Sequence, residues 1–170
     1  MTLVFVRTTD RGLTDRLLWS FADMLLKGGF KLAGVVQTNS ERPGSHHCDM
    51  DIRVLPDGKV IRINQVLGEE SQGCRLNPAA LEEAVGLVET ALDKSPDLLI
   101  INKFGKHEGE GRGFRPLIAE ALVRGIPVLL GVNKLNQEAF EAFAGDISRE
   151  LEADGESLAG WFKELRKLAA

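Results

Sequence analysis

The stretch PDLLIINKFGKHEGEGRGF, residues 96–114, decides both the fold and the first candidate site of this chain. Its apolar run at residues 98–101 follows a proline turn, and such a run predicts a strand that is buried on both faces of a sheet. Residues 102–113 are then mostly charged residues and glycines, which predict a loop. Because open α/β sheets bind ligands at the carboxyl ends of their strands, this loop is a candidate binding site.

On both sides of this stretch, strand patterns alternate with helix patterns. Apolar runs predict strands at residues 3–6, 32–36 and 128–132, the second of which should end at Gln37. Apolar residues at helical spacing predict helices that begin near Leu13, Pro78, Phe114 and Asn136, and a last helix at about residues 157–168. Strands separated by helices of this length predict mostly parallel pairing with right-handed crossovers.

Two further apolar runs flank Asp57-Gly58 and predict a β-hairpin at about residues 50–64. This hairpin is either an insertion or an edge of the sheet. The expected fold is therefore a single α/β domain over residues 1–170. It is a three-layer sandwich with a mostly parallel sheet and an inserted β-hairpin.

The composition indicates a soluble globular protein and excludes several classes of partner. The chain has 170 residues, 44% of them hydrophobic, and a net charge of −4, which gives no general attraction to nucleic acid or to anionic membranes. No apolar run approaches the ~20 residues that insertion across a bilayer requires. Two cysteines do not make a disulfide framework, so a reducing cytoplasm is the expected location.

The turn between the first strand and the first helix lies where a phosphate-binding loop would lie. In the pattern G-x-x-x-x-G-K-[ST], glycines let backbone amides cradle phosphates, the lysine reaches the outer phosphates and the hydroxyl holds magnesium. Here Gly12 and Thr14 are present, but Arg7 replaces the first glycine and Leu13 replaces the lysine. Loss of the lysine predicts loss of efficient hydrolysis, whereas anion binding at the helix start can survive. Taken alone, the loop favours a plainer interpretation, a polar turn capped by Asp10 or Thr14.

Several passages together resemble a known family. The first loop, GVVQTN at residues 34–39 and DLLIINKFGKHEGEGRGF at residues 97–114 resemble the small bacterial and archaeal nucleoside-triphosphatases of the P-loop class. CDMDIRVLPDG, GCRLNPAALE and INKFGKHEGEGRGF are similar to an uncharacterised bacterial family related to them. The resemblance extends to about Gly131. It implies a connection to molybdate uptake, because members of that family are often encoded beside molybdate-uptake genes.

The resemblance also implies that the catalytic groups are degenerate. In the active nucleoside-triphosphatases an acidic pair ends the strand that corresponds to residues 98–101. This pair supports magnesium and activates water, and a G-K-x-E stretch follows it. This chain has Asn102 and Lys103 in place of the acids, while Gly105, Lys106 and Glu108 match the rest. With the missing lysine, three catalytic roles are lost. A working hydrolase of that mechanism is therefore not expected.

Replacement of the acids predicts a site that attracts anions. The resemblance implies that the predicted strands at residues 3–6 and 98–101 are neighbours. This would bring Arg7 and Arg11 close to the loop at residues 102–113. The predicted ligand-binding residues are Arg7, Thr8, Gly12, Thr14, Asn102, Lys103, Lys106, Gly111, Arg112 and Gly113. The alternative is a solvated loop in which Glu108 or Glu110 pairs with a lysine or an arginine.

His46, His47, Cys48 and Asp49, followed by Asp51, gather the common metal-ligating side chains in six positions. Imidazole and thiolate together suit zinc or copper-like ions. The cluster lacks the separated pairs of a structural zinc site, so a polar loop that enters the hairpin is the plainer interpretation. A third alternative is that residues 46–51 cover the pocket.

Three functions are therefore considered. The first is a degenerate P-loop-like protein that binds a nucleotide or an oxyanion without efficient hydrolysis, as an accessory to molybdate or molybdenum-cofactor handling. The second is a nucleoside-triphosphatase or phosphotransferase, in which Lys103 or Lys106 replaces the loop lysine and Glu108 acts as the base. The third is a regulatory or scaffold protein with a vestigial pocket. A nucleotide, Mg²⁺ or molybdate as cofactor, and a protein partner or a homo-oligomer, remain open.

Overall fold

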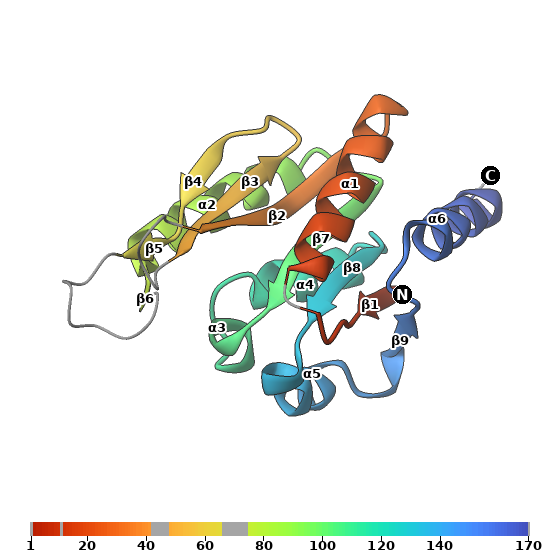
Figure 1. Cartoon of the computed structure of the whole chain (residues 1–170). Coiled ribbons are helices and arrows are strands. Elements are labelled where there is room, and N and C mark those ends of the chain that lie inside the picture. The colour runs from red at the N-terminus through yellow and green to blue at the C-terminus, as the bar shows by residue number, and fades with distance from the viewer. Residues whose placement is uncertain (1, 11, 42–47, 66–74, 170) are drawn as a thin grey trace.

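The computed structural model describes residues 2–10, 12–41, 48–65 and 75–169. Its main sheet has seven strands in the order β4-β3-β2-β7-β8-β1-β9 (Figure 1). These strands are β1 (Leu3–Val6), β2 (Leu32–Glu41), β3 (Cys48–Leu55), β4 (Val60–Arg62), β7 (Leu98–Phe104), β8 (Val128–Val132) and β9 (Ser148–Leu151). The pairs β2–β7, β7–β8, β8–β1 and β1–β9 are parallel. Strand β3 pairs antiparallel with both β2 and β4. The predicted mostly parallel sheet is confirmed.

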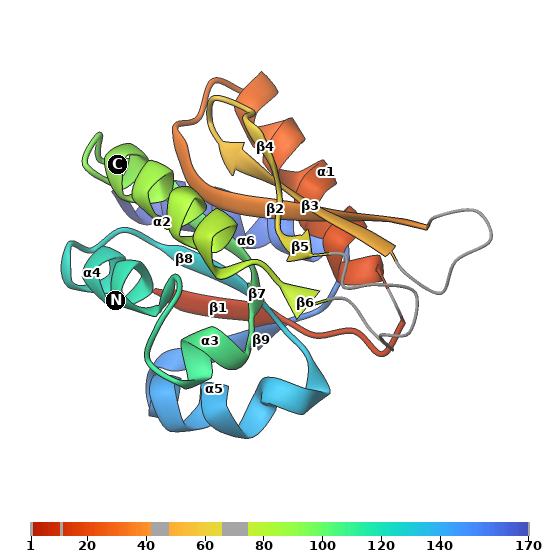
Figure 2. The ribbon, with the colours of Figure 1, turned by 90° about the vertical axis from the view of Figure 1, so that its left-hand side faces the viewer.

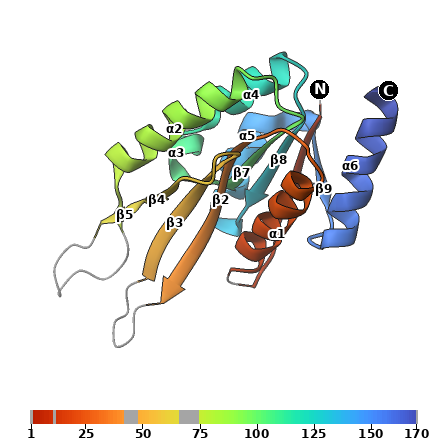
Figure 3. The ribbon, with the colours of Figure 1, turned by 90° about the horizontal axis from the view of Figure 1, so that it is seen from above.

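Helices cover both faces of this sheet. They are α1 (Leu13–Lys27), α2 (Pro78–Leu92), α3 (Lys106–Gly109), α4 (Arg115–Val123), α5 (Gln137–Ala144) and α6 (Gly155–Ala169). Figure 3 shows α1 and α6 on one face and α2 and α4 on the other. One hydrophobic core packs under α1 and α6, and the second packs under α2, α4 and α5. The three-layer α/β sandwich is therefore confirmed.

Strand β7 lies at the centre of the molecule because both of its faces are apolar. Leu98 and Ile100 enter the core under α1, while Leu99 and Ile101 enter the core under α2, and all four are fully buried. The strand does not stop before Asn102, as the sequence predicted, but continues to Phe104. Phe104 is fully buried beside two phenylalanine rings of α5, and this packing extends the strand through two polar residues.

The hairpin predicted around Asp57-Gly58 is present as β3 and β4, and it forms an edge of the main sheet. Strand β2 runs past Gln37 to Glu41, because β3 pairs with it antiparallel from Gly34 to Glu41. A two-stranded ladder of β5 (Asn64–Gln65) and β6 (Arg75–Leu76) then leads into α2 (Figure 2). Strand β9 was not predicted, because its sequence SREL has no apolar run.

Local signals set the helix ends. The Asn77 side chain accepts hydrogen bonds from the amides of Ala79 and Ala80 at 3.1 and 3.3 Å, and Pro78 occupies the first helical position of α2. Helix α6 buries Trp161 and Phe162 against the core under α1. Among the described residues, no helix is long and apolar enough to cross a membrane.

Candidate functional site

A cleft of about 330 Å³ lies at the start of α1, at the carboxyl ends of the central strands. We call it the β1–α1 cleft. Its lining residues are Thr8, Thr9, Asp10, Gly12, Thr14, Asp15, Gln37, Asn39, Met50, Asn102, Lys103, Gly131, Val132 and Asn133. Gly12 precedes α1 in the left-handed region, and the Thr8 and Thr14 hydroxyl oxygens are 3.0 Å apart. The cleft therefore combines a helix start with two hydroxyl groups.

Arg7 does not join this cleft. Its guanidinium donates to both carboxylate oxygens of Glu150 on β9, at 3.1 and 2.9 Å. This contact exists because β9 runs parallel beside β1. The expectation that β1 and β7 are neighbours is wrong, since β8 lies between them. Arg11 lies outside the described residues.

A buried hydrogen-bond network forms the floor of the cleft. The Asp15 carboxylate accepts from the Asn102 amide at 2.7 Å and from the Asn39 amide at 2.8 Å. The Asn102 side-chain oxygen accepts from the backbone amide of Gln37 at 3.0 Å, and the Gln37 amide donates to Asn39 at 2.8 Å. Asp15, Gln37 and Asn102 are all less than 8% exposed. The side-chain amides of Asn39 and Asn102 thus donate to both oxygens of the Asp15 carboxylate. Through its two hydrogen bonds, Asn102 connects α1 with β2.

The approach of three elements at this network depends on Gly131 of β8. A Cβ atom on this residue would lie 2.1 Å from the Asn102 carbonyl oxygen and 2.8 Å from the Thr14 methyl carbon. Only a residue without a side chain lets β8 come this close to Asn102 of β7 and Thr14 of α1. Sequence reasoning missed Asp15 and Gly131, because one acid in a first helical turn and one glycine in an apolar run are common without any site.

The Glu108 carboxylate, a predicted catalytic candidate, accepts hydrogen bonds from two backbone amides. One comes from Gly105 at 2.9 Å and the other from Phe114 at 3.0 Å, and Glu108 is 4% exposed. Gly113 has a φ of +60°, and a Cβ atom there would lie 2.2 Å from the nearer Glu108 oxygen. The loop after β7 is therefore closed around the Glu108 side chain, and Gly111 and Gly113 are its turn residues.

The other charges of this loop gather at Glu110. Arg112 donates to the Glu110 carboxylate, and this hydrogen bond holds the pKa of Glu110 below its ordinary value. The Lys106 ammonium lies 3.7 Å from the same carboxylate and is 83% exposed. Lys106 and Arg112 therefore do not converge with Thr8, Gly12 and Thr14.

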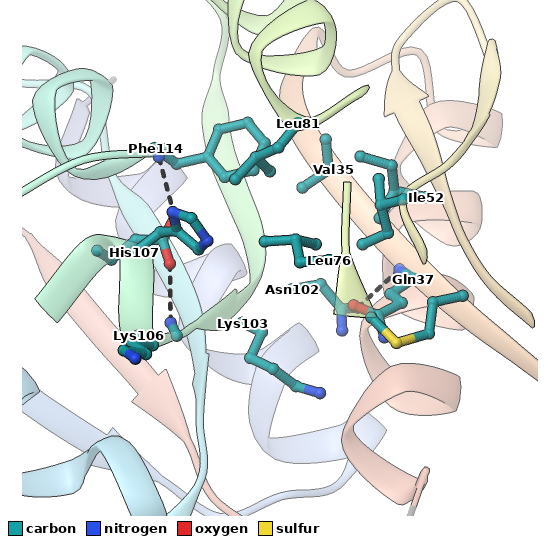
Figure 4. Close-up of a pocket in the computed structure, with 14 residues that line it drawn as sticks. Val35, Gln37, Ile52, Leu76, Leu81, Asn102, Lys103, Lys106, His107 and Phe114 are labelled. Carbon is teal, nitrogen blue, oxygen red and sulfur yellow. Dashed lines mark hydrogen bonds between the residues drawn. The ribbon is translucent and has the colours of Figure 1, made fainter. Parts of the chain in front are cut away.

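Lys103 differs from these cations. Its side chain is exposed and extends from β7 (Figure 4), and Lys103 lines two cavities. Within the described part of the chain, its ammonium has no hydrogen-bond or ion-pair partner. One of the two cavities is the β1–α1 cleft.

The second cavity, of about 290 Å³, we call the apolar pocket. Its lining residues are Val35, Gln37, Met50, Ile52, Ile63, Leu76, Leu81, Asn102, Lys103, Gly105, Lys106, His107, Glu108 and Phe114. They come from β2, β3, β6, β7, α2 and α3 and from the segments beside them. Figure 4 shows Leu76, Leu81 and Phe114 around this space, with Lys103 on its polar side.

The predicted metal ligands His46 and His47 lie outside the described residues, as does the side chain of Cys48. Asp49 forms an ion pair with Arg62 at 3.1 Å. In the described ranges, no group of three or more His, Cys, Asp or Glu side chains is placed to hold a metal ion. The metal site stays a prediction.

Comparison with known proteins gives a family match and a fold match. The model of a family described as a protein of unknown function (DUF2478) matches residues 3–161. The molybdenum import ATP-binding protein ModC 2 of Bradyrhizobium diazoefficiens is 35% identical over 150 residues. This match spans 88% of the present chain but 17% of the length of that relative.

Two solved structures share the fold. THEP1 from the hyperthermophile Aquifex aeolicus superposes with a TM-score of 0.66 at 17% identity, over 99% of this chain and 98% of that one. A human cancer-related nucleoside triphosphatase, solved in solution, gives a TM-score of 0.65 at 14% identity, over 99% and 97% of the two chains. The predicted relation to the fold of small P-loop nucleoside-triphosphatases is confirmed.

Proposed function

This chain belongs to the DUF2478 family, and we propose that it binds the phosphates of a nucleotide, or a free oxyanion, without efficient hydrolysis. The observation that carries this proposal is the β1–α1 cleft, where the start of α1, the two threonine hydroxyls and Lys103 line one cavity. Among the described residues, the Lys103 ammonium has no hydrogen-bond or ion-pair partner. Helix starts attract anions through free backbone amides and the helix dipole. The fold shared with a nucleoside triphosphatase supports a nucleotide as the ligand.

The residues of the cleft favour binding over hydrolysis. Leu13 stands where the phosphate-loop lysine would stand, so no cation from that position reaches the outer phosphates. Asn102 replaces an acid, and both polar groups of its side chain are used inside the buried network. Neither residue supplies the group that magnesium-dependent phosphoryl transfer needs.

The enzyme alternative required Glu108 as a general base, and its surroundings favour a structural role. A base must reach the proton that it removes, directly or through one water molecule. Both oxygens of the Glu108 carboxylate already accept backbone amides, and the residue is almost fully buried. We therefore propose that Glu108 holds the loop after β7 in shape.

The relative named as a molybdenum import ATP-binding protein supports a role near molybdenum import. In that protein a segment similar to this chain makes up 17% of the length. Segments that occur within one polypeptide commonly act in one process, so we propose an accessory role in molybdate or molybdenum-cofactor handling. The expected cytoplasmic location remains part of this proposal.

Calorimetric titration tests the proposal with ATP, GTP, molybdate, tungstate, sulfate and phosphate, each with and without Mg²⁺. We expect binding of at least one of them, and Mg²⁺ should not strengthen it, because Asn102 and Lys103 occupy the positions where an acid pair would hold the ion. Phosphate release from ATP and GTP should stay at the background rate. No binding of any of the six at millimolar concentration would overturn the proposal in favour of the scaffold alternative.

A pair of matched variants locates the bound anion. Lys103→Glu reverses the charge at the cleft, and Lys163→Glu makes the same change on the exposed face of α6. We expect the first to weaken binding about fivefold or more, since an exposed ion pair contributes up to about 1 kcal/mol and the reversal adds repulsion. Equal affinities of the two variants would contradict the assignment to this cleft.

A further inference from the structure

The apolar pocket adjoins the β1–α1 cleft but has a different chemistry. Val35, Ile52, Ile63, Leu81 and Phe114 line it, and each of these side chains also belongs to the core under α2. In most of this core, side chains fill the space between sheet and helix. Here they leave a cavity of about 290 Å³, close to the lower end of the range for small-molecule sites.

The loop after β7 holds one wall of this pocket rigid. The Glu108 carboxylate joins the Gly105 and Phe114 amides, so α3 and the Phe114 ring keep a fixed relation. The opposite wall is fixed by β3 and the segment after β4, where the Ile63 backbone amide donates to the Met50 carbonyl oxygen at 2.9 Å and the Met50 amide donates to the Asn64 side-chain oxygen at 2.9 Å. A cavity between two such walls is preformed and does not need to open for a ligand.

The charged side chains that line the pocket present more positive than negative charge to it. Its single carboxylate among the lining residues, Glu108, is buried and already bonded to two amides. Lys103 carries a positive charge with no partner in the described part of the chain, and Lys106 has only the 3.7 Å contact to Glu110. An apolar space with unpaired positive charge on its rim complements a molecule with an apolar body and an anionic group.

We propose that the apolar pocket binds a small organic anion, with its apolar body against Leu76, Leu81 and Phe114 and its anionic group at Lys103. The apolar walls of this site are separate from the phosphate site proposed for the β1–α1 cleft, and binding against them does not require that site to be occupied. The two sites share Lys103, Asn102, Gln37 and Met50, so an anion in one site competes with an anion in the other for the Lys103 ammonium. A bare oxyanion cannot use the apolar walls, whereas an aromatic carboxylate, sulfonate or phosphate ester can.

Two fluorescent probes that differ by one charged group test the proposal. 8-Anilinonaphthalene-1-sulfonate carries an apolar ring system and a sulfonate, and N-phenyl-1-naphthylamine is the same molecule without the sulfonate. We expect the wild type to bind one sulfonate probe per folded chain, about three- to fivefold more tightly than the neutral probe, as an exposed ion pair allows. Lys103→Met should remove this preference, and Lys163→Met should preserve it.

Leu76→Trp separates the pocket from the cleft, because Leu76 lines the pocket and is absent from the lining of the cleft. The larger side chain fills the cavity, so both probes should bind at least tenfold more weakly, while calorimetric titration with molybdate, sulfate and phosphate stays unchanged. Equal affinity of the wild type for the two probes would overturn the proposal without any variant. So would probe binding that Leu76→Trp leaves intact. Neither result would bear on phosphate binding in the cleft.

Discussion

The replacement Asn102→Asp tests the buried network beneath the β1–α1 cleft. In the wild type, the Asn102 amide nitrogen donates to the Asp15 carboxylate at 2.7 Å, and Asn102 is 2% exposed. The variant places a second carboxylate oxygen at that distance from the first. Two unit charges ~3 Å apart repel by about 5.5 kcal/mol even at an effective dielectric constant of about 20. The pair therefore takes up one proton instead of carrying both charges.

This proton sets the size of the effect. Because a free aspartic acid has a pKa of about 3.9, protonating one carboxyl group at about pH 7 costs about 4 kcal/mol. The protonated group can again donate to Asp15, so no further hydrogen bond is lost. The free energy of unfolding should fall by about 3–4 kcal/mol at about pH 7. The folded variant binds more protons than the unfolded chain, so the deficit should shrink by about 1.4 kcal/mol for each pH unit down to about pH 5.

Urea denaturation across this pH range measures the deficit. The matched control is Asn77→Asp, which changes the same charge at the N-cap of α2, where aspartate caps as well as asparagine. We expect millimolar Mg²⁺ to recover part of the stability of Asn102→Asp and to leave the wild type unchanged, because Mg²⁺ prefers carboxylate oxygens. A variant as stable as the wild type at neutral pH, without Mg²⁺, would refute the reasoning.

Three further predictions concern the loop after β7 and the edge of the sheet. Gly113→Ala should lower the free energy of unfolding by about 2–3 kcal/mol, because the new Cβ would clash with the Glu108 carboxylate. Gly111→Ala should lower it by only about 1 kcal/mol, since that residue also has a left-handed backbone but a Cβ there would meet no neighbouring atom. Urea denaturation of the two variants measures the difference. Glu108→Gln should lower the free energy of unfolding by about 1.5–3 kcal/mol, since one amide loses its charged acceptor, and a phosphate-release assay should show no change from the wild-type rate. A double-mutant cycle of Arg7→Ala and Glu150→Ala should give a coupling of at most about 1 kcal/mol that falls with added salt, because both side chains are partly exposed, and Arg7→Ala should leave anion binding unchanged.

The sequence predicted the architecture because its strongest patterns are those of the core. The side chains of residues 98–101 enter the two cores alternately, and all four are fully buried. A solvent-exposed loop would not bury four consecutive apolar side chains. The end of this strand was harder to predict. Asn102 and Lys103 resemble the beginning of a loop, and only the packing of Phe104 against α5 keeps them in β7. Strand β9 had no local signal, since an exposed edge strand needs no apolar run.

The site was predictable in position and less so in its contacts. The first loop and the end of β7 do line one cleft, as the strand order of an open α/β sheet requires. The partners of its charges depend on segments far away in the sequence. Arg7 meets Glu150, which is 143 positions away, and Asn102 meets Asp15, which is 87 positions away. A single sequence contains no information on such pairs beyond the type of each residue.

These contacts change what the cleft can be expected to bind. The predicted convergence of Arg7, Lys103, Lys106 and Arg112 would have suited a triphosphate, yet three of these cations have carboxylate partners of their own. Lys103 lines the cleft together with the exposed Asp10 and the amide-bound Asp15. One cation cannot balance the charge of a triphosphate without a metal ion, and Asn102 and Lys103 occupy the positions where an acid pair would hold that ion. Among the proposed ligands, those with one or two negative charges therefore match the described part of the cleft better than a nucleoside triphosphate.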